Sequence, residues 1–361
     1  MGIGHVMRCL TLADALKSKG ATCQFICRAH EGHLIDLIRG KGHVAHVLHV
    51  VNKSSERMLL LQSTCDSWGA DLSHAPWLGS TQIEDAQACA SILASQHPDW
   101  LVVDHYALDV TWERALSPHY RRLLVIDDLA DRQHVCDLLV DQTYGRDTED
   151  YASLVPADCR LLCGSQFALL RPEFAALRQY SLQRRTKPAL RELLISLGGV
   201  DKDNATGGIL EALRTCPMPD TCRITVVMGS TAPWMDAVRK QAMEEMPLPT
   251  RVLVGVSNMA QLMADSDLAI GAAGATSWER CCLGVPAIML VLADNQRKVA
   301  QGLMHAGGAL ILTQGPEAGA QLATWFEVWR RDPAQLCRMS ESAAGVVDGM
   351  GTNSVLEFLD A

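Results

Sequence analysis

The sequence predicts an α/β protein made of two doubly wound domains that face one another across a cleft. Short apolar runs alternate with segments of helical periodicity along both halves of the chain, which is typical of parallel sheets covered by helices on both faces. Glycine-rich turns follow several of these runs, at the strand ends where ligands collect in such sheets. A charged, proline-containing segment at 184–188 separates the halves. We therefore predict a first domain over 1–186 and a second over 187–361.

The composition limits what kind of protein this is. Of 361 residues, 48% are hydrophobic and 20% charged, which describes a soluble globular protein with ample core for two domains. The net charge of -9 disfavours a nucleic-acid partner, and no apolar run approaches the roughly 18 residues of a membrane span. Thirteen cysteines without a Cys-x-x-Cys pair suit a reducing cytoplasm. We expect a cytoplasmic monomer that acts on a small molecule, with no membrane or nucleic-acid partner.

The first half opens on a helix over about 4–16, followed by strands near 23–28 and 43–50 with a helix between them. Residues 51–96 are polar and mostly helical in pattern; strands follow at 100–104, 122–127 and 138–141, and 151–187 form a crossover. Glycine-rich turns in doubly wound sheets normally follow a strand, yet none precedes the opening helix. We therefore expect the first strand of this domain to be missing from the chain.

The second half repeats the alternation. Its predicted strands lie at 193–197, 222–228, 250–254, 268–270 and 286–291, and two helices, at about 318–331 and 353–359, close the chain. Three glycine-rich turns follow strands of this sheet, at Gly198-Gly199, Gly255 and Gly271–Gly274. Because parallel strands end at the same edge, these turns are expected to gather there.

His5 is the candidate catalytic residue. It lies in the first turn of the opening helix, three residues before Arg8 and therefore on the same side. The unpaired N–H groups and positive dipole end favour an anion there, and Gly4 lets a ligand approach the backbone. An imidazole in this place suits a general base, although it could instead only bond a backbone carbonyl. Asp104 and Tyr106 end a buried strand and are predicted substrate contacts; the alternative is a strand cap and a packed ring.

The turn from Gly274 to Ser277 is the candidate anion site of the second half. It opens a helix, so its N–H groups and the hydroxyls of Thr276 and Ser277 could bind phosphate. Glu279, one turn further on, could accept hydrogen bonds from ribose hydroxyls. Helix capping would use the same groups and is the alternative. The histidines at 30, 33, 43, 46 and 49 lack the carboxylate or cysteine that would complete a metal site, so none is predicted.

A set of motifs in a fixed order carries a resemblance to a known family. They are Gly4-His5-Val6-Met7-Arg8-Cys9, Asp104-His105-Tyr106, Leu170-Arg171-Pro172-Glu173-Phe174, Ser196-Leu197-Gly198-Gly199, Thr276-Ser277-Trp278-Glu279-Arg280 and Asp294-Asn295-Gln296. The chain resembles the UDP-2,4-diacetamido-2,4,6-trideoxy-β-L-altropyranose hydrolases of pseudaminic acid biosynthesis, which are relatives of the MurG-type glycosyltransferases. The resemblance implies the GT-B fold of two Rossmann-like domains.

The resemblance also implies an activity and a site. Water would replace a sugar acceptor, His5 would activate it, and UDP would lie on the second domain, with Glu279 on the ribose. The substrate-binding positions implied or predicted from the pattern are Gly4, Arg8, Asp104, Tyr106, Arg171, Gly198, Gly199, Gly274, Thr276, Ser277, Glu279, Asn295 and Gln296. No metal and no cofactor is implied. Two alternatives stay open: a glycosyltransferase that uses the same UDP pocket, and a UDP-sugar-binding protein without activity.

Overall fold

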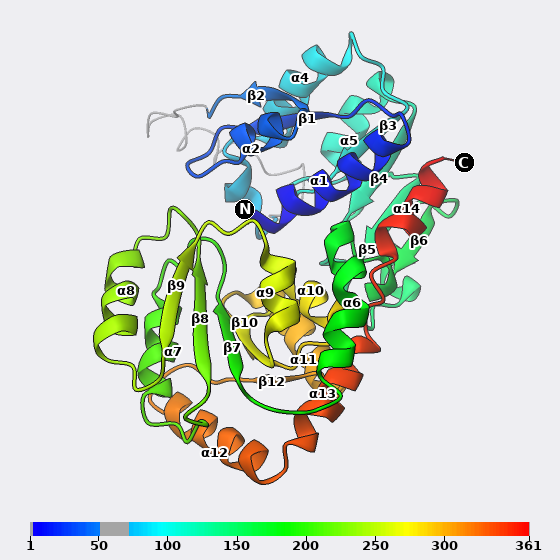
Figure 1. Cartoon of the computed structure of the whole chain (residues 1–361). Helices are drawn as coiled ribbons and strands as arrows, with labels where there is room; N and C mark the ends of the chain where they lie inside the picture. The colour runs from blue at the N-terminus through cyan, green and yellow to red at the C-terminus, as the bar shows by residue number, and fades with distance from the viewer. Residues whose placement is uncertain (1–2, 51–71, 361) are drawn as a thin grey trace. The chain divides into compact units, whose positions relative to one another are not determined.

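The computed structural model describes residues 3–50 and 72–360, which divide into two compact units (Figure 1). Unit 1 comprises Met1–Gln142, Arg146–Phe167 and Asn353–Ala361, and unit 2 comprises Thr143–Gly145 and Ala168–Thr352. Each is a Rossmann-like α/β domain with parallel strands, as the sequence predicts. Among the described residues, no helix combines the length and the apolar character that crossing a bilayer requires.

Unit 1 contains six parallel strands in two sheets. Its elements are α1 (Ile3–Ser18), β1 (Gln24–Arg28), α2 (Ile35–Gly40), β2 (Val44–Leu48), the 3₁₀ turn η1 (Ala75–Leu78), α4 (Gln82–Leu93), β3 (Trp100–Val103), α5 (Val110–Leu116), η2 (Ser117–His119), β4 (Arg122–Ile126), β5 (Leu138–Asp141), η3 (Thr148–Tyr151), β6 (Arg160–Cys163), η4 (Ser165–Phe167) and most of α14 (Gly351–Leu359). One sheet pairs β1 with β2, and the other has the order β3-β4-β5-β6. Both β1 and β3 are therefore edge strands.

The helices of unit 1 follow from local sequence signals. Thr81 caps α4 with a complete capping box, in which its hydroxyl accepts from the Glu84 N–H and the Glu84 carboxylate accepts from the Thr81 N–H. Leu10 on α1 packs with Ile35 and Ile38 of α2, so the first helix is held by an apolar face with helical spacing. Of the mostly helical pattern that is predicted over 51–96, residues 51–71 lie outside the described residues.

Unit 2 is built on one six-stranded parallel sheet with the order β12-β11-β10-β7-β8-β9. Its elements are α6 (Pro172–Arg184), β7 (Glu192–Ser196), α7 (Ala205–Leu213), β8 (Arg223–Met228), α8 (Met235–Glu244), β9 (Thr250–Val254), α9 (Met259–Asp265), β10 (Leu268–Ala272), α10 (Thr276–Cys282), β11 (Ala287–Leu290), η5 (Asp294–Gln296), α11 (Arg297–His305), β12 (Ala309–Ile311), α12 (Ala318–Arg331) and α13 (Ala334–Ala344). The strands are nearly continuous apolar runs because helices bury both faces.

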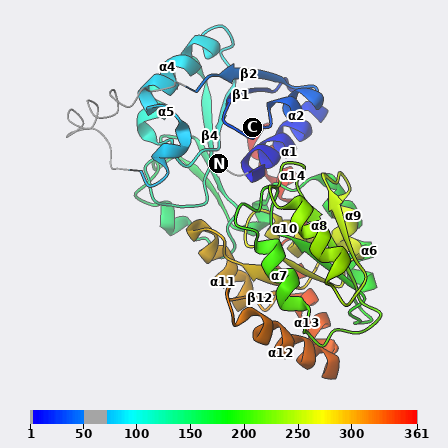
Figure 2. The same ribbon diagram turned by 90° about the vertical axis from the view of Figure 1, so that its left-hand side faces the viewer.

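Two apolar clusters cover the two faces of this sheet. One includes side chains of α7, α8 and α12, and the other side chains of α6, α9, α10 and α11. The helices α7 and α8, on the left of the unit in Figure 1, face the viewer in Figure 2. The doubly wound prediction is confirmed for this half, since helices pack on both faces of its parallel sheet.

The packing divides the chain earlier than the predicted position between 186 and 187. Unit 2 begins at Ala168, so α6 belongs to the second unit rather than to the first. The Arg178 guanidinium on α6 explains this, because it donates to the carbonyls of Cys282, Ala344 and Val347 within unit 2. The last helix, α14, belongs mainly to unit 1, where the Leu359 carbonyl accepts from the Trp100 indole N–H at 3.2 Å.

Candidate active site

His5 lies on the first turn of α1 and is hydrogen-bonded to a carboxylate at the end of β3. Its Nδ1 is 2.5 Å from Oδ1 of Asp104, and the side chains of His5 and Asp104 are 12% and 2% exposed. A carboxylate on Nδ1 keeps the proton on that nitrogen, which leaves Nε2 of the neutral ring as the basic atom. The arrangement is that of an oriented general base, rather than of a histidine bonded to a backbone carbonyl.

Arg8 joins the same carboxylate to a second one. Its Nε and Nη2 each donate to Asp104 at 2.7 Å, and its Nη1 donates to Oδ2 of Asp128 at 2.7 Å. The Tyr106 hydroxyl donates to that Asp128 oxygen at 2.8 Å, and the Tyr106 ring meets the His5 ring edge-on at 4.7 Å between centroids. Five side chains from α1 and from the ends of β3 and β4 therefore form one network.

Electrostatics keep Asp104 ionised. Burial alone would raise the pKa of Asp104, but the Arg8 charge, the attraction of His5 when its ring is protonated and the hydrogen bonds from both side chains outweigh it, so its pKa lies well below the usual range. Burial, with the neighbouring Asp128 carboxylate, raises the pKa of Tyr106, which stays a neutral donor. Burial and the nearby His5 lower the pKa of His105 to about 4, and its Nδ1 accepts from the Ala107 N–H. The His105 ring is thus neutral, and its Nδ1 already accepts a hydrogen bond from the backbone.

Three predicted substrate contacts of unit 1 are placed differently from the prediction. Asp104 and Arg8 are buried against each other, and the Tyr106 side chain is only 5% exposed with its hydroxyl on Asp128. A buried guanidinium needs carboxylate partners, which is why the ends of β3 and β4 supply two of them. These residues hold His5 in place instead of presenting free groups to a ligand. Gly4 lies in the first turn of α1, as predicted.

The second group of predicted residues lies at the carboxyl edge of the unit 2 sheet. The strand order reverses between β7 and β10, and the turns at Gly198-Gly199 and Gly271–Gly274 follow these two neighbouring strands. In open α/β sheets this switch point is where a ligand binds. On the other side of β7, the turns after β7 and β8 approach closely, because a Cβ on Gly229 would come within 1.9 Å of the Gly199 carbonyl oxygen.

Glu279 and Arg171 are brought together near this edge. An Arg171 nitrogen lies 3.5 Å from the Glu279 carboxylate and another lies 2.8 Å from Glu173. Burial raises the pKa of Glu279, even though the Arg171 and Arg280 charges act in the opposite direction. The long 3.5 Å contact leaves the Glu279 carboxylate weakly paired, so it has capacity to accept hydrogen bonds from a ligand.

Arg280 lies beneath the turn and holds its two hydroxyls. Its guanidinium donates to Thr276 Oγ1 at 3.2 Å, to Ser277 Oγ at 3.0 Å and to the Ala272 carbonyl at 2.8 Å. The Ser277 side chain is fully buried, so the predicted phosphate contact through its hydroxyl is not at the surface. Thr276 is half-buried and keeps its place on the turn. Burial lowers the pKa of Arg280, and no carboxylate forms an ion pair with it in the described part of the chain.

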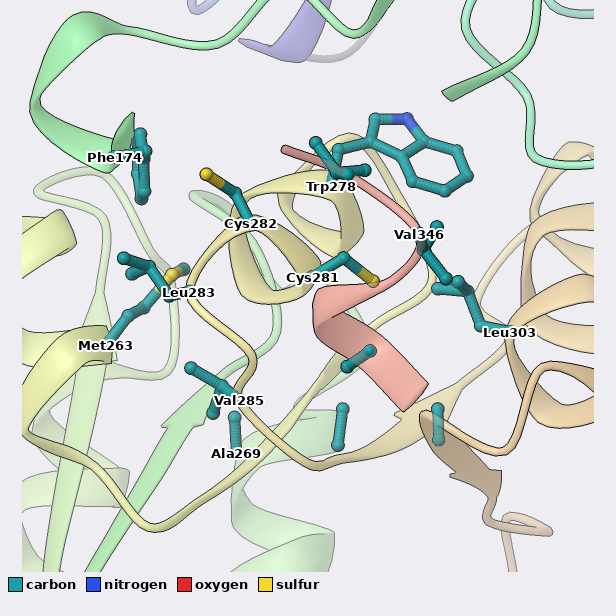
Figure 3. Close-up of a cluster of buried hydrophobic side chains, with 14 of the residues drawn as sticks. Phe174, Met263, Ala269, Trp278, Cys281, Cys282, Leu283, Val285, Leu303 and Val346 are labelled. Carbon is teal, nitrogen blue, oxygen red and sulfur yellow. The ribbon is translucent and has the colours of Figure 1, made fainter. Parts of the chain in front are cut away.

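The core of unit 2 anchors α10, which carries these groups. Trp278, Cys281 and Cys282 belong to the apolar cluster of Figure 3, which also contains Phe174 of α6. The adjacent Cys281 and Cys282 are therefore packing residues of this core. In η5, after the next strand β11, the Gln296 side chain accepts from the Leu292 N–H at 2.9 Å, and Asn295 is exposed beside it.

Sequence reasoning did not single out several residues that the structure places in these two groups. Asp128 directly follows the strand β4 and its neighbour Asp127, a signal that strand-end reasoning could have used. Arg280 lies in one of the motifs that carry the resemblance, but no role was assigned to it, because its role depends on how α10 packs. Two of the histidines considered for a metal have other partners, since His43 bonds Asp14 at 2.8 Å and His46 bonds Gln24 at 2.7 Å.

Residues 220–350 match the glycosyltransferase family 28 C-terminal domain. The spore coat polysaccharide biosynthesis protein SpsG of Bacillus subtilis is 25% identical over 89% of this chain and 94% of its own length. The UDP-2,4-diacetamido-2,4,6-trideoxy-beta-L-altropyranose hydrolase of Campylobacter jejuni is 24% identical over 85% of this chain and 93% of its own length.

The fold has relatives among solved structures. Acinetobacter baumannii MurG superposes with a TM-score of 0.70 at 17% identity, covering 99% of this chain and 96% of that one. This likeness confirms the two Rossmann-like domains expected from the sequence. The chain is therefore a GT-B protein whose second unit resembles the C-terminal domain of glycosyltransferase family 28.

Proposed function

We propose that this protein hydrolyses a UDP-sugar to UDP and the free sugar. The substrate that the resemblance favours is UDP-2,4-diacetamido-2,4,6-trideoxy-β-L-altropyranose, the compound named for the Campylobacter jejuni relative that matches over most of both chains. The observation that carries the proposal is the His5–Asp104 hydrogen bond of 2.5 Å, because it orients the imidazole as a general base.

The chemistry assigned to His5 is a single proton transfer. Nε2 takes a proton from water as the water oxygen forms a bond to the anomeric carbon. The bond from that carbon to the β-phosphate oxygen breaks, and UDP leaves with the bonding electron pair. Asp104 stabilises the imidazolium that forms, because its charge lies against Nδ1. The sum is UDP-sugar and water giving UDP and the free sugar.

The UDP half of the substrate is assigned to unit 2. The support is the switch point between β7 and β10, the close backbone approach at Gly198-Gly199, and the buried Arg280 charge under the turn that starts at Gly274. Glu279 would accept from the ribose hydroxyls, and Asn295 and Gln296 complete the edge next to it. Thr276 and the backbone of the turn would face the diphosphate.

A UDP-release assay without any sugar acceptor tests the hydrolase proposal. UDP and free sugar should appear together in equal amounts in the presence of water alone. Release that starts only when a sugar acceptor is added would instead support glycosyl transfer, which the match to the family 28 domain favours as the second candidate. Binding of the UDP-sugar without release under either condition would contradict both activities.

Glu279→Ala should weaken UDP binding by about 10- to 100-fold, because each hydrogen bond to a charged acceptor contributes roughly 1.5–3 kcal/mol. The measurement is the UDP dissociation constant by titration calorimetry. Glu173→Ala is the matched control, since it removes the other carboxylate on Arg171, one that is 41% exposed. Equal affinities of wild type and Glu279→Ala would remove Glu279 from the ribose.

A further inference from the structure

A row of aromatic rings leads from His5 to the surface of unit 1. The Tyr106 ring centroid is 4.7 Å from that of His5, the His74 ring is 5.5 Å from Tyr106, and the Trp77 ring is 6.1 Å from Tyr106. Trp77 and His74 lie 4.5 Å apart. Tyr106 is 5% exposed and Trp77 is 36% exposed, so the row ends in an indole that solvent reaches.

The turn that carries Trp77 is fixed on its C-terminal side. Leu78, the next residue, is 5% exposed within the core of unit 1. Gly79 has a φ of +69°, and a Cβ there would come within 2.5 Å of the His30 ring. A side chain at this position would be strained and would also push the turn away. The indole is thus exposed to solvent, and the Tyr106 ring separates it from the candidate base His5.

An exposed aromatic wall next to a polar group is the arrangement that binds an amphipathic ligand. Aromatic rings bury the apolar groups of a ligand at little cost in side-chain freedom. The hydroxyl groups of a ligand need hydrogen bonds, which the faces of aromatic rings do not offer. The ligand portion that fits is therefore a sugar with apolar groups, such as an acetamido methyl or a deoxy carbon.

We propose that Trp77, supported from behind by His74 and Tyr106, forms a sugar subsite that selects acetamido- or deoxy-substituted sugars over fully hydroxylated ones. This inference rests on the proposed function, since it places the sugar of the substrate beside His5. Trp77 contributes the exposed contact face, and the His74 ring packs against the indole.

Two variants at one position separate the ring from the rest of the residue. Trp77→Ala should raise KM for the acetamido UDP-sugar by about tenfold with kcat within about threefold, while Trp77→Phe should stay close to wild type because it keeps an aromatic face. Tyr180→Ala is the control, since Tyr180 is an aromatic residue of α6 that is 47% exposed and bonded to Asp265. An unchanged KM in Trp77→Ala would overturn the subsite.

A binding measurement separates this inference from the hydrolase proposal. Saturation-transfer NMR with free N-acetylglucosamine and with glucose needs no turnover. The acetamido methyl should receive saturation from the wild type and from Trp77→Phe, but not from Trp77→Ala, and glucose should receive little from any of them. If this pattern holds while UDP release fails, the subsite stands and the hydrolase does not. If UDP is released but methyl saturation is independent of Trp77, the subsite is wrong and the hydrolase stands.

Discussion

His5→Ala should lower kcat for UDP release by about 10²- to 10⁴-fold, the usual contribution of a general base. The reason is geometric, because the only change is loss of the imidazole that Asp104 orients at 2.5 Å. UDP affinity should change by less than about threefold, since the residues assigned to UDP lie in unit 2. Steady-state UDP release and calorimetric titration with UDP measure the two quantities separately.

Chemical rescue sharpens this test. Free imidazole in the buffer should restore part of the lost rate in His5→Ala, because a small base can enter the space that the side chain leaves. His305→Ala, which changes an exposed histidine at the end of α11, should behave as the wild type. A kcat for His5→Ala equal to that of the wild type would exclude His5 as the base. A large loss of UDP affinity together with kcat would indicate a binding role instead.

The alternation of strands and helices could be predicted from the sequence because buried parallel strands consist almost entirely of apolar residues. Leu193–Leu197 and the run at 268–270 need no tertiary information to be identified, since helices cover both of their faces. Shorter edge elements such as β12 and β6, and the helix α13, were not predicted. The apolar patterns of these segments are short, so their secondary structure depends on packing against neighbouring elements.

Some residues of the candidate site could also be predicted from the sequence, whereas the contacts between them could not. His5 could be identified because a glycine-histidine pair at a helix start is a local pattern, and Asp104 because it ends a buried strand. Their bond could not, since it joins residues 99 positions apart. Trp77 follows from no local pattern, because what matters is that Leu78 turns inward and leaves the indole outside. Ser277 was expected at the surface, but Arg280 draws its hydroxyl into the core.

Asp104→Asn should lower both activity and stability, and the two effects have separate causes. The amide cannot stabilise the imidazolium of His5, so kcat should fall on the order of 10²- to 10⁴-fold. It also removes one of two carboxylates from Arg8, a side chain that is 6% exposed. Breaking a buried pair costs roughly 3–5 kcal/mol, and the remaining contact to Asp128 places the expected loss near 3 kcal/mol.

The pH dependence of this stability difference follows from the lowered pKa of Asp104. The folded pKa lies below its ordinary value of 3.8, so the carboxylate stabilises the fold at every pH above about 4. The ionisation of Asp104 itself should therefore contribute equally at pH 7 and at about pH 5 to the difference between wild type and Asp104→Asn in urea unfolding. This contribution should shrink as the pH falls below about 4, where the unfolded chain gains a proton that the folded Asp104 does not take up.

Two matched variants show which effect belongs to His5. Asp128→Asn removes the other carboxylate from Arg8 but leaves the His5–Asp104 bond, so it should lower stability with a much smaller loss of kcat than Asp104→Asn. Asp99→Asn, in an ion pair whose side chains are 77% and 76% exposed, should change stability by less than about 1 kcal/mol. If Asp104→Asn and Asp128→Asn lose stability and kcat in the same proportion, Asp104 acts only through Arg8. A loss of kcat confined to Asp104→Asn makes it the residue that positions the base.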